Sequence, residues 1–285
     1  MPTHSSNCPD CGQVVEYWRV QCRCGYFVGF PNYRDVAAER AELTTRHTAA
    51  QDDCKKRGVA PLLTKLEDLA EQSRPVIAMF FSACDEILRA DKYRNYHQRI
   101  DSGERDPSGA EDHADREMVG ARLFPTYNHH IHYAALSSNG RGLSSYGPVA
   151  VRWEVTPVYL GRRATLLEDN SFTFYDRHSL GQRGATIPPG YRAIWEDRMK
   201  LAAAKIAPRL TTATGESRLP GLLLQPGRTR NDDDFIEVAI YADGGLDTQD
   251  VDMVTVQQSA TTSEEAHRQR LVREICAVRG ITFVE

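Results

Sequence analysis

The 285-residue sequence lacks long apolar runs and has little net charge. No stretch approaches the roughly 20 apolar residues that a membrane-spanning helix needs, and the polar start MPTHSSN is unlike a signal peptide. The formal net charge of -4 gives no general attraction to nucleic acid. Hydrophobic residues make up 41% of the chain and charged residues 26%, which is ordinary globular composition. We therefore expect a soluble, cytoplasmic protein with no membrane partner.

Short motifs of several common enzyme classes are also absent. The sequence has no G-x-x-x-x-G-K-[ST] phosphate loop and no G-x-S-x-G nucleophile turn. It likewise has no H-E-x-x-H zinc helix and no G-x-G-x-x-G dinucleotide loop. Phosphate-loop and serine-hydrolase chemistry therefore lack support in the sequence.

Cysteine is present in an odd number, seven, and is spread unevenly, which is unlike a secreted disulfide framework. Four cysteines near the start form a C-x2-C pair, Cys8 and Cys11, and a C-x-C pair, Cys22 and Cys24. Turn residues flank both pairs, and the alternating VVEYWRV segment between them favours a returning strand. Four thiolates brought together in this way are the ligands of a tetrahedral Zn²⁺ ion. The spacing predicts a structural zinc site in a zinc ribbon at residues 1–33.

This zinc ribbon has several conceivable roles. A segment of about 30 residues has too small a core to fold alone, so the metal would hold it together. The ribbon could also dock a protein partner or contact nucleic acid. Four cysteines fill the coordination shell, which argues against a catalytic zinc with an open position. The three isolated cysteines, Cys54, Cys84 and Cys276, are predicted to be buried thiols.

The remaining sequence changes from a helical to a strand-rich pattern. Residues 34–100 are predicted to be a helical region, with one charged helix ended by Gly58 and another over PVIAMFFSACDEILRA. Residues 101–120 contain a polar, Gly- and Pro-containing run that predicts a loop or domain boundary. Residues 121–285 mix strands and helices without regular alternation, which predicts an α+β domain with a mixed or antiparallel sheet.

Within residues 121–285 the patterns predict individual elements. The predicted strands are HHIHYAAL, GPVAVRWEV, SFTFY, FIEVAIY, DVDMVTV and ITFVE. Helices are predicted over YRAIWEDRMKLAAAKIA and over SEEAHRQRLVREICAVR, the second with Ser263 as its N-cap and Gly280 as its stop.

The histidines of HHIHY need separate consideration. Strand alternation places His130 and His132 on one face and His129 on the other. Two imidazoles on one face could bind a metal. Because no third ligand is evident in the sequence, a histidine in or beside a polar pocket is the simpler interpretation.

Four features follow one another along the chain: the histidine strand, SSYGPVAVRWEV, RRATLLEDNSFTFYD and DDDFIEVAIYADGGLDTQDVDMVTV. In this order they resemble the catalytic half of mono-ADP-ribosyltransferases of the bacterial toxin type. YGPVAV…RRATLLEDNSF is similar to a segment in which such proteins carry Arg-Ala-Thr followed by a small hydroxyl residue. FIEVAIYADGGLDTQDV resembles their glutamate strand, turn and next strand. The resemblance spans about residues 127–258 and implies a split-sheet fold, NAD as substrate and toxin- or defence-like biology.

The resemblance implies roles for individual residues. Glu237 would be catalytic, because breaking the nicotinamide–ribose bond builds positive charge on the ribose that a nearby carboxylate stabilises. Ser171 would orient Glu237 or touch the ribose. The remaining candidates would bind NAD: His130 or His132 at the ribose, Tyr146 or Tyr175 against the nicotinamide, Arg163 at the pyrophosphate and Thr173 beside Ser171.

The sequence departs from the family pattern near Glu237. Many members carry Gln or Glu two residues before or after the catalytic glutamate, where this chain has Phe235 and Ala239. The acceptor of ADP-ribose, protein or nucleic acid, is therefore left open. An alternative for Glu237 is the polar face of a half-exposed strand, since Phe235, Glu237 and Ala239 share one side.

From these patterns we predict an NAD-dependent mono-ADP-ribosyltransferase that acts on a macromolecule. The alternatives are a non-enzymatic zinc-ribbon adaptor that binds nucleic acid or a protein partner, and an NAD hydrolase that uses water as acceptor. An enzyme should bring Glu237, Ser171 and a histidine into one cleft, whereas an adaptor should leave them scattered.

Overall fold

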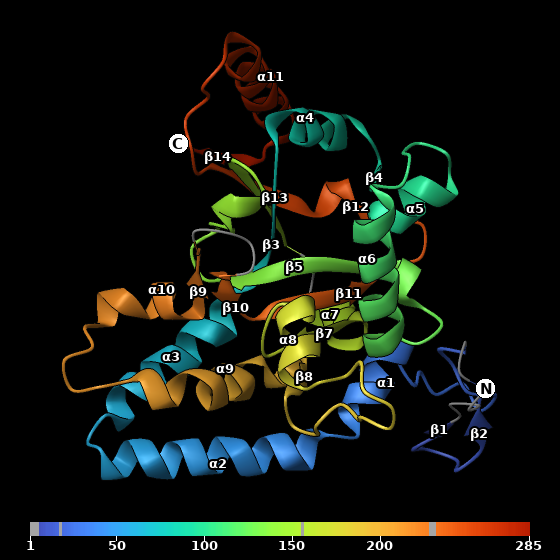
Figure 1. Cartoon of the computed structure of the whole chain (residues 1–285), viewed down its shortest axis with the longest axis vertical. Helices are drawn as coiled ribbons and strands as arrows, with labels where there is room; N and C mark the ends of the chain where they lie inside the picture. The colour runs from blue at the N-terminus through green and yellow to red at the C-terminus, as the bar shows by residue number, and fades with distance from the viewer. Residues whose placement is uncertain (1–5, 17–18, 155–156, 228–231) are drawn as a thin grey trace.

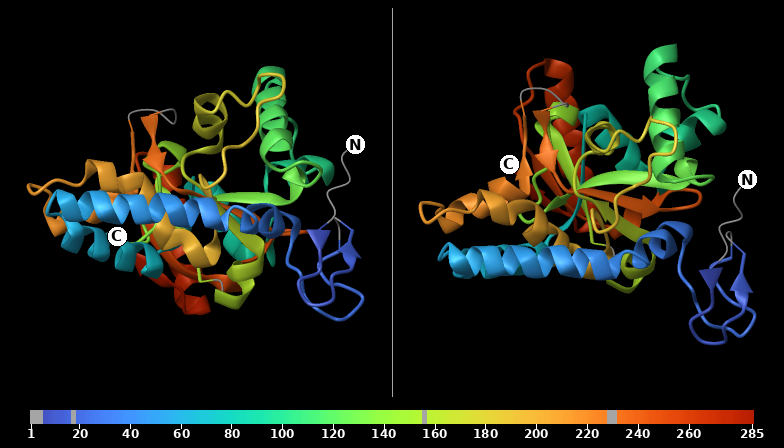
Figure 2. Two further views of the ribbon diagram at one scale, coloured as in Figure 1. Left: turned by 90° about the horizontal axis from the view of Figure 1, so that it is seen from below. Right: turned by 60° about the horizontal axis from the view of Figure 1, so that its bottom comes forward.

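The computed structural model of the chain describes residues 6–16, 19–154, 157–227 and 232–285. One large sheet runs through the centre of the molecule, with helices packed on both of its faces (Figure 1). The N-terminal segment that carries the four clustered cysteines projects at one side of this body (Figure 2). The protein is thus of the mixed α+β class, as the sequence predicts.

Within the described residues, the central sheet has eight strands in the order β14-β13-β6-β3-β5-β11-β7-β8. Neighbours are antiparallel except for the parallel pair β13 and β14, so the predicted mixed sheet is confirmed. In chain order its strands are β3 (Arg74–Met79), β5 (Ile131–Ser137), β6 (Val149–Trp153), β7 (Ala164–Leu167), β8 (Arg192–Ile194), β11 (Glu237–Tyr241), β13 (Val251–Val256) and β14 (Thr282–Val284). Short two-stranded pairs join β1 (Ser6–Asn7) to β2 (Val14–Val15), β4 (Lys92–Tyr93) to β12 (Leu246–Asp247), and β9 (Leu224–Gln225) to β10 (Asp234–Phe235).

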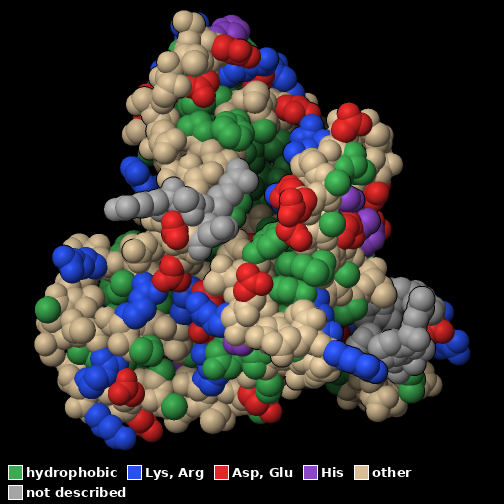
Figure 3. Space-filling model, in the orientation of Figure 1, with side chains coloured by type: hydrophobic (Ala, Val, Ile, Leu, Met, Phe, Trp, Pro, Cys, Tyr) green, Lys and Arg blue, Asp and Glu red, His purple; other side chains and the backbone are tan. Residues whose placement is uncertain are grey.

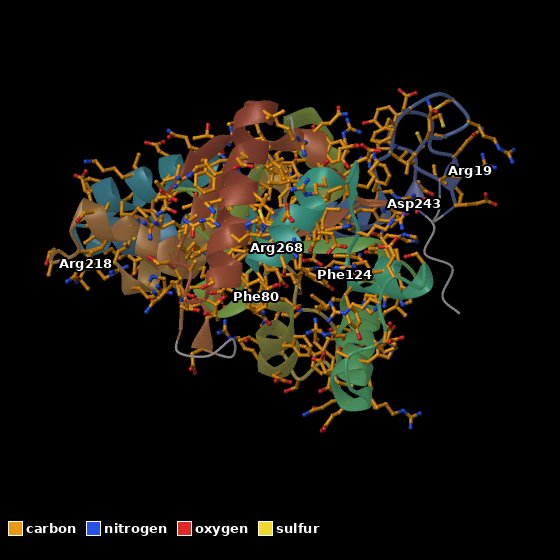
Figure 4. The ribbon with its side chains drawn as sticks, turned by 90° about the horizontal axis from the view of Figure 1, so that it is seen from above. Arg19, Phe80, Phe124, Arg218, Asp243 and Arg268 are labelled. Carbon is orange, nitrogen blue, oxygen red and sulfur yellow. The ribbon has the colours of Figure 1, made fainter. Side chains whose placement is uncertain are left out.

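The larger hydrophobic core joins one face of the sheet to most of the long helices. Its helices are α2 (Arg40–Lys56), α3 (Ala60–Gln72), α4 (Phe81–Arg89), α9 (Arg198–Ile206), α10 (Leu219–Leu223) and α11 (Ser263–Arg279). Helices α2, α3 and α9 pack together at one end of the molecule, whereas α4 and α11 pack together at the other (Figure 1). Arg268 on α11 reaches across to Asp85 of α4, with Nη1 2.8 Å from the carboxylate (Figure 4).

The opposite face of the sheet is covered by α6 (Ala110–Leu123) and α8 (Ser171–Arg177). A smaller core forms there between these helices and strands β5, β7 and β11, and it includes Leu123, Ile131, Leu167, Phe174 and Ala239. The remaining helices are α1 (Pro31–Ala37), α5 (Tyr96–Asp101) and α7 (Pro157–Arg163). The short 3-10 helices that lie wholly in the described part of the chain are η1 (Asn128–His130), η2 (Ser144–Tyr146), η3 (Trp195–Asp197), η4 (Ala207–Arg209), η5 (Glu216–Arg218) and η7 (Thr248–Asp250).

Three predicted elements were wrong, and a fourth was wrong in part: the helix predicted over YRAIWEDRMKLAAAKIA begins with strand β8, and only its second part forms helix α9. The apolar run predicted as one helix begins with strand β3, which lies in the middle of the sheet, and only its second part forms helix α4. A strand covered on both faces is apolar throughout, so its pattern resembles that of a buried helix. SFTFY forms helix α8 instead of a strand, because Asn170 caps a helix there by accepting a hydrogen bond from Phe172 N–H. Helix α6 occupies the whole second half of the predicted loop at 101–120.

The C-terminal helix and its stop were predicted correctly. Helix α11 is capped by Thr262, one residue before the predicted Ser263, in a capping box with Glu265. It ends at Gly280, whose φ of 70° is left-handed and suits glycine. Among the described helices, none has the length and apolar character to cross a membrane.

Candidate functional site

Glu237 begins strand β11 in the interior of the sheet. The strand lies between β5 and β7, and Glu237 pairs in register with Ala135 on one side and Leu167 on the other. Only 5% of the residue is exposed, and its strand neighbours through Ile240 are buried as well. The strand is therefore covered on both faces, and Glu237 does not lie on a solvent-facing side.

The alternation predicted for this strand is present in the structure. Ile236, Val238 and Ile240 pack into the larger core, whereas Ala239 packs into the smaller core beneath α6 and α8. Glu237 shares the side of Ala239 because side chains two residues apart point to the same face of a strand. A carboxyl group is thus placed on the face that α6 and α8 cover.

Helix α8 brings its N-terminal residues to this carboxyl group. The backbone N–H of Ser171 donates a hydrogen bond to Oε2 of Glu237 at 2.8 Å. Asn170, which caps the helix, also donates from Nδ2 to the hydroxyl oxygen of Tyr146 at 3.2 Å. The two predicted catalytic residues, Glu237 and Ser171, are therefore in direct contact, and Tyr146 lies beside them.

The protonation of Glu237 is strongly perturbed by its surroundings. Burial is the main cause that raises the pKa of its carboxyl group to about 8. The hydrogen bonds from Ser171 lower this pKa, and the negative charge of Asp169 raises it further. A carboxyl group with this pKa changes its charge near neutral pH. Such a shift in a cleft is a physical signature of functional sites.

A pocket of about 280 Å³ opens beside Glu237. Its walls come from β5, β11, α5, α6, η2 and the start of α8. Aromatic rings provide part of the lining, namely Tyr96, Tyr133, Tyr146 and Phe172. Polar groups provide the rest, including Asn95, His97, Asp112, Arg116, Asn170, Ser171 and Glu237. A pocket with aromatic walls and a few converging polar groups suits a planar, polar ligand.

The two predicted histidines lie away from this lining. His132 is on the opposite face of β5, where its Nε2 is 3.1 Å from the carbonyl oxygen of Tyr93. Burial lowers the pKa of His132 to about 4, so its ring is neutral. His130 precedes the strand and lies near Tyr241 and Asp243, with Nδ1 3.4 Å from the Asp243 carboxylate.

The other predicted ligands of NAD also lie elsewhere, apart from Tyr146. The Arg163 guanidinium stacks 4.2 Å from the ring centre of Phe30 and 4.3 Å from that of Tyr159. Thr173 is half-buried on α8, and Tyr175 packs in the smaller core. Among the described residues, the lining of the Glu237 pocket includes none of these three.

Sequence reasoning missed the residues that α5 and α6 contribute to the pocket. His97 lines it from α5, and Asp112 and Arg116 line it from α6. Arg116 pairs with Asp112 at 3.0 Å, and its guanidinium lies 5.2 Å from the ring centre of Tyr96. The i,i+4 spacing of Asp112 and Arg116 was the available signal for a helix in a segment otherwise typical of a loop.

The four N-terminal cysteines converge as their spacing predicts. The Sγ atoms of Cys8 and Cys24 are 3.7 Å apart, and those of Cys11 and Cys22 are 3.5 Å apart. All four sulfur atoms lie within 4.8 Å of one another, so they could hold one metal ion. Sulfur atoms are drawn in yellow among the loops of this segment in Figure 4. The isolated cysteines, Cys54, Cys84 and Cys276, are buried thiols, as predicted.

No protein-family model matches the sequence, and no curated protein matches it significantly.

Proposed function

We propose that this protein cleaves NAD at the nicotinamide–ribose bond and transfers ADP-ribose to a macromolecule, as the resemblance to mono-ADP-ribosyltransferases implies. The observation that carries the proposal is the contact between Glu237 and Ser171 at the wall of the pocket. Glu237 is held by a strand with neighbours on both sides, which fixes its position more firmly than a loop would.

The reaction needs a negative charge beside the ribose. The bond between ribose C1′ and the nicotinamide nitrogen breaks, its electron pair leaves with nicotinamide, and C1′ becomes an oxocarbenium-like centre. Glu237 as a carboxylate stabilises that charge, and the acceptor then bonds to C1′ while its proton passes to a base or to water. Because the nicotinamide ring of NAD is cationic before cleavage, it departs neutral without needing an acid.

The raised pKa of Glu237 is compatible with this role. A cationic nicotinamide bound near the carboxyl group favours the ionised form and so opposes the effect of burial. Binding of NAD would thereby ionise the group that the next step requires. NAD binding and loss of the Glu237 proton are coupled in this proposal.

The pocket offers a partner for each part of the nicotinamide half of NAD. Tyr146 and Phe172 supply aromatic surface for the nicotinamide ring, as expected for Tyr146. Arg116 is the cation of α6 that lines the pocket, and we assign it to the pyrophosphate in place of Arg163. His130, His132 and Thr173 have no contact with NAD in this assignment.

We further propose that the cysteine cluster binds a structural Zn²⁺ ion. Zinc–thiolate bonds of about 2.3 Å in a tetrahedron place sulfur atoms about 3.8 Å apart. Two of the sulfur–sulfur separations here, 3.5 and 3.7 Å, are close to that value. The ion would hold together a segment whose own core consists of Cys8, Val15, Cys22 and Val28.

The test is to incubate the protein with NAD labelled in its adenine half and with a cell lysate. We expect the label to become attached to protein or nucleic acid with the wild type, and not with Glu237→Gln. Glu264→Gln, which changes an exposed glutamate of α11, is the matched control and should label as the wild type does. Nicotinamide release with no label transferred would replace the transferase by an NAD hydrolase. No nicotinamide release at all would refute the proposal.

A further inference from the structure

Two histidines and one glutamate converge on α6 at the flank of the molecule. His97 comes from α5, Glu117 from α6 and His129 from η1. The Nδ1 atom of His97 and the Nε2 atom of His129 each lie 2.9 Å from the same oxygen, Oε1 of Glu117. Histidine and acidic side chains are visible together on this flank in Figure 3.

The two imidazole rings are arranged in parallel. The His97 and His129 ring centres are 4.5 Å apart and the ring planes differ by 6°. In this arrangement one nitrogen of each ring points towards the same oxygen atom of Glu117. One ligand atom from each of the three residues lies within 4.8 Å of the other two. A tetrahedral ion with bonds of about 2.0–2.1 Å needs ligand atoms about 3.3 Å apart, so small side-chain shifts would admit it.

A second layer of contacts holds these three side chains in place. The other ring nitrogen of His129, Nδ1, is 3.4 Å from a carboxylate oxygen of Asp101. The second oxygen of Glu117 accepts a hydrogen bond from Asn128 at 3.3 Å. Asn95, which caps α5, donates to the carbonyl oxygen of His129 at 2.9 Å and so joins α5 to η1. A carboxylate on the distal nitrogen of a ligand histidine is a recurrent feature of metal sites.

We propose that His97, Glu117 and His129 bind one divalent transition-metal ion of the Zn²⁺ type. Two imidazoles and one carboxylate favour Zn²⁺ and its neighbours over Ca²⁺ and Mg²⁺, which take oxygen ligands. Three protein ligands leave at least one coordination position to water or to an incoming oxygen. The ion would be separate from that of the cysteine cluster and does not depend on the proposed reaction with NAD.

Such an ion would connect the elements that shape one wall of the Glu237 pocket. His97 also lines the pocket, and α6 carries Arg116 and Asp112 on the same wall. Metal binding would therefore fix α5 and α6 against η1, and backbone amides of these elements should exchange more slowly when the ion is bound.

The test uses the full chain reconstituted with Co²⁺, which reports its ligands through its absorption spectrum. The wild type should bind two equivalents. One gives the intense thiolate charge-transfer bands of the cysteine cluster, and the other gives weaker bands of a nitrogen and oxygen site. Glu117→Gln and His129→Gln should lose only the second set, whereas His267→Gln, at an exposed histidine of α11, should keep both. Persistence of the second set in both site variants would overturn the proposal.

A measurement on the wild type alone covers the case in which the variants fail to fold. Zn²⁺ added to protein whose cysteine cluster is already filled should bind with one further equivalent and slow hydrogen exchange over residues 96–130. The absence of a second equivalent, or binding that leaves exchange over these residues unchanged, would contradict the site.

Discussion

Replacing Glu237 by Gln should stabilise the protein, and increasingly so as the pH rises. In the unfolded chain the carboxyl group ionises near its ordinary pKa of 4.5, whereas burial raises the pKa in the folded protein to about 8. Between these values the unfolded chain has released a proton that the folded protein retains. The contribution of this carboxyl group to the free energy of unfolding is therefore present in full below pH 4.5 and is lost as the pH rises towards 8.

The size of this effect follows from the separation of the two pKa values. Each unit of pH between them costs about 1.4 kcal/mol, so the wild type should lose about 3 kcal/mol from this group between pH 4 and pH 7. The glutamine side chain of the Glu237→Gln variant does not titrate, and its amide oxygen can still accept the hydrogen bond from Ser171 N–H. Between pH 4 and pH 7, the unfolding free energy of Glu237→Gln should therefore rise by about 3 kcal/mol relative to that of the wild type.

Urea unfolding of both proteins across this pH range measures the difference directly, because the titration of other groups cancels. Glu264→Gln serves as control and should show a difference that stays near zero. A difference for Glu237→Gln that is flat with pH, or that turns against the variant, would show that the carboxyl group is ionised in the folded protein. The electrostatic description of the pocket would then be wrong.

Three further predictions follow from the same structure. The kcat/KM for NAD should rise with pH up to about 8 and then level off, since this parameter reports the ionisation of Glu237 in the free enzyme; a flat profile measured by nicotinamide release would contradict it. Cys22→Ser should lower the zinc content and the thermal stability of the N-terminal segment, and unchanged metal analysis would refute the assignment. Leu136→Ala removes a fully buried side chain from β5 and should cost about 2–5 kcal/mol in urea unfolding, whereas a loss below about 1 kcal/mol would not fit the packing described.

The cysteine cluster and strand β11 were predictable because local chemistry determines them. A short hairpin between two close cysteine pairs brings all four thiols to one point, and their sulfur atoms converge as expected. The alternation around Glu237 gave the correct faces of β11, since side chains of a strand alternate regardless of its neighbours. The alternation could not reveal that the face of β11 with Glu237 and Ala239 is also buried, because the helices that cover it, α6 and α8, are distant in sequence.

Strand β3 and helix α8 were mispredicted for a related reason. A strand in the middle of a sheet is apolar on both faces, so Val76, Ile77 and the residues after them fit a helical pattern equally well. In SFTFY the β-favouring aromatic residues are outweighed by the cap at Asn170 and by burial of Phe174 against the sheet.

The polar residues of the pocket were the hardest to predict. His97 and Arg116 come from helices α5 and α6, which lie between β3 and β5 in the sequence, and only tertiary packing brings them to Glu237. The same packing separates His130 and His132 from the pocket. His132 follows the alternation of β5 onto the other face, and His130 precedes that strand.

The most direct test of the account is the rate of nicotinamide release from NAD by the purified protein, at a pH near 8. The wild type should release nicotinamide, Glu264→Gln should match it, and Glu237→Gln should lose nearly all of the activity while remaining folded. Equal release by the Glu237→Gln variant, or none by the wild type, would contradict the assignment of this carboxyl group to NAD cleavage.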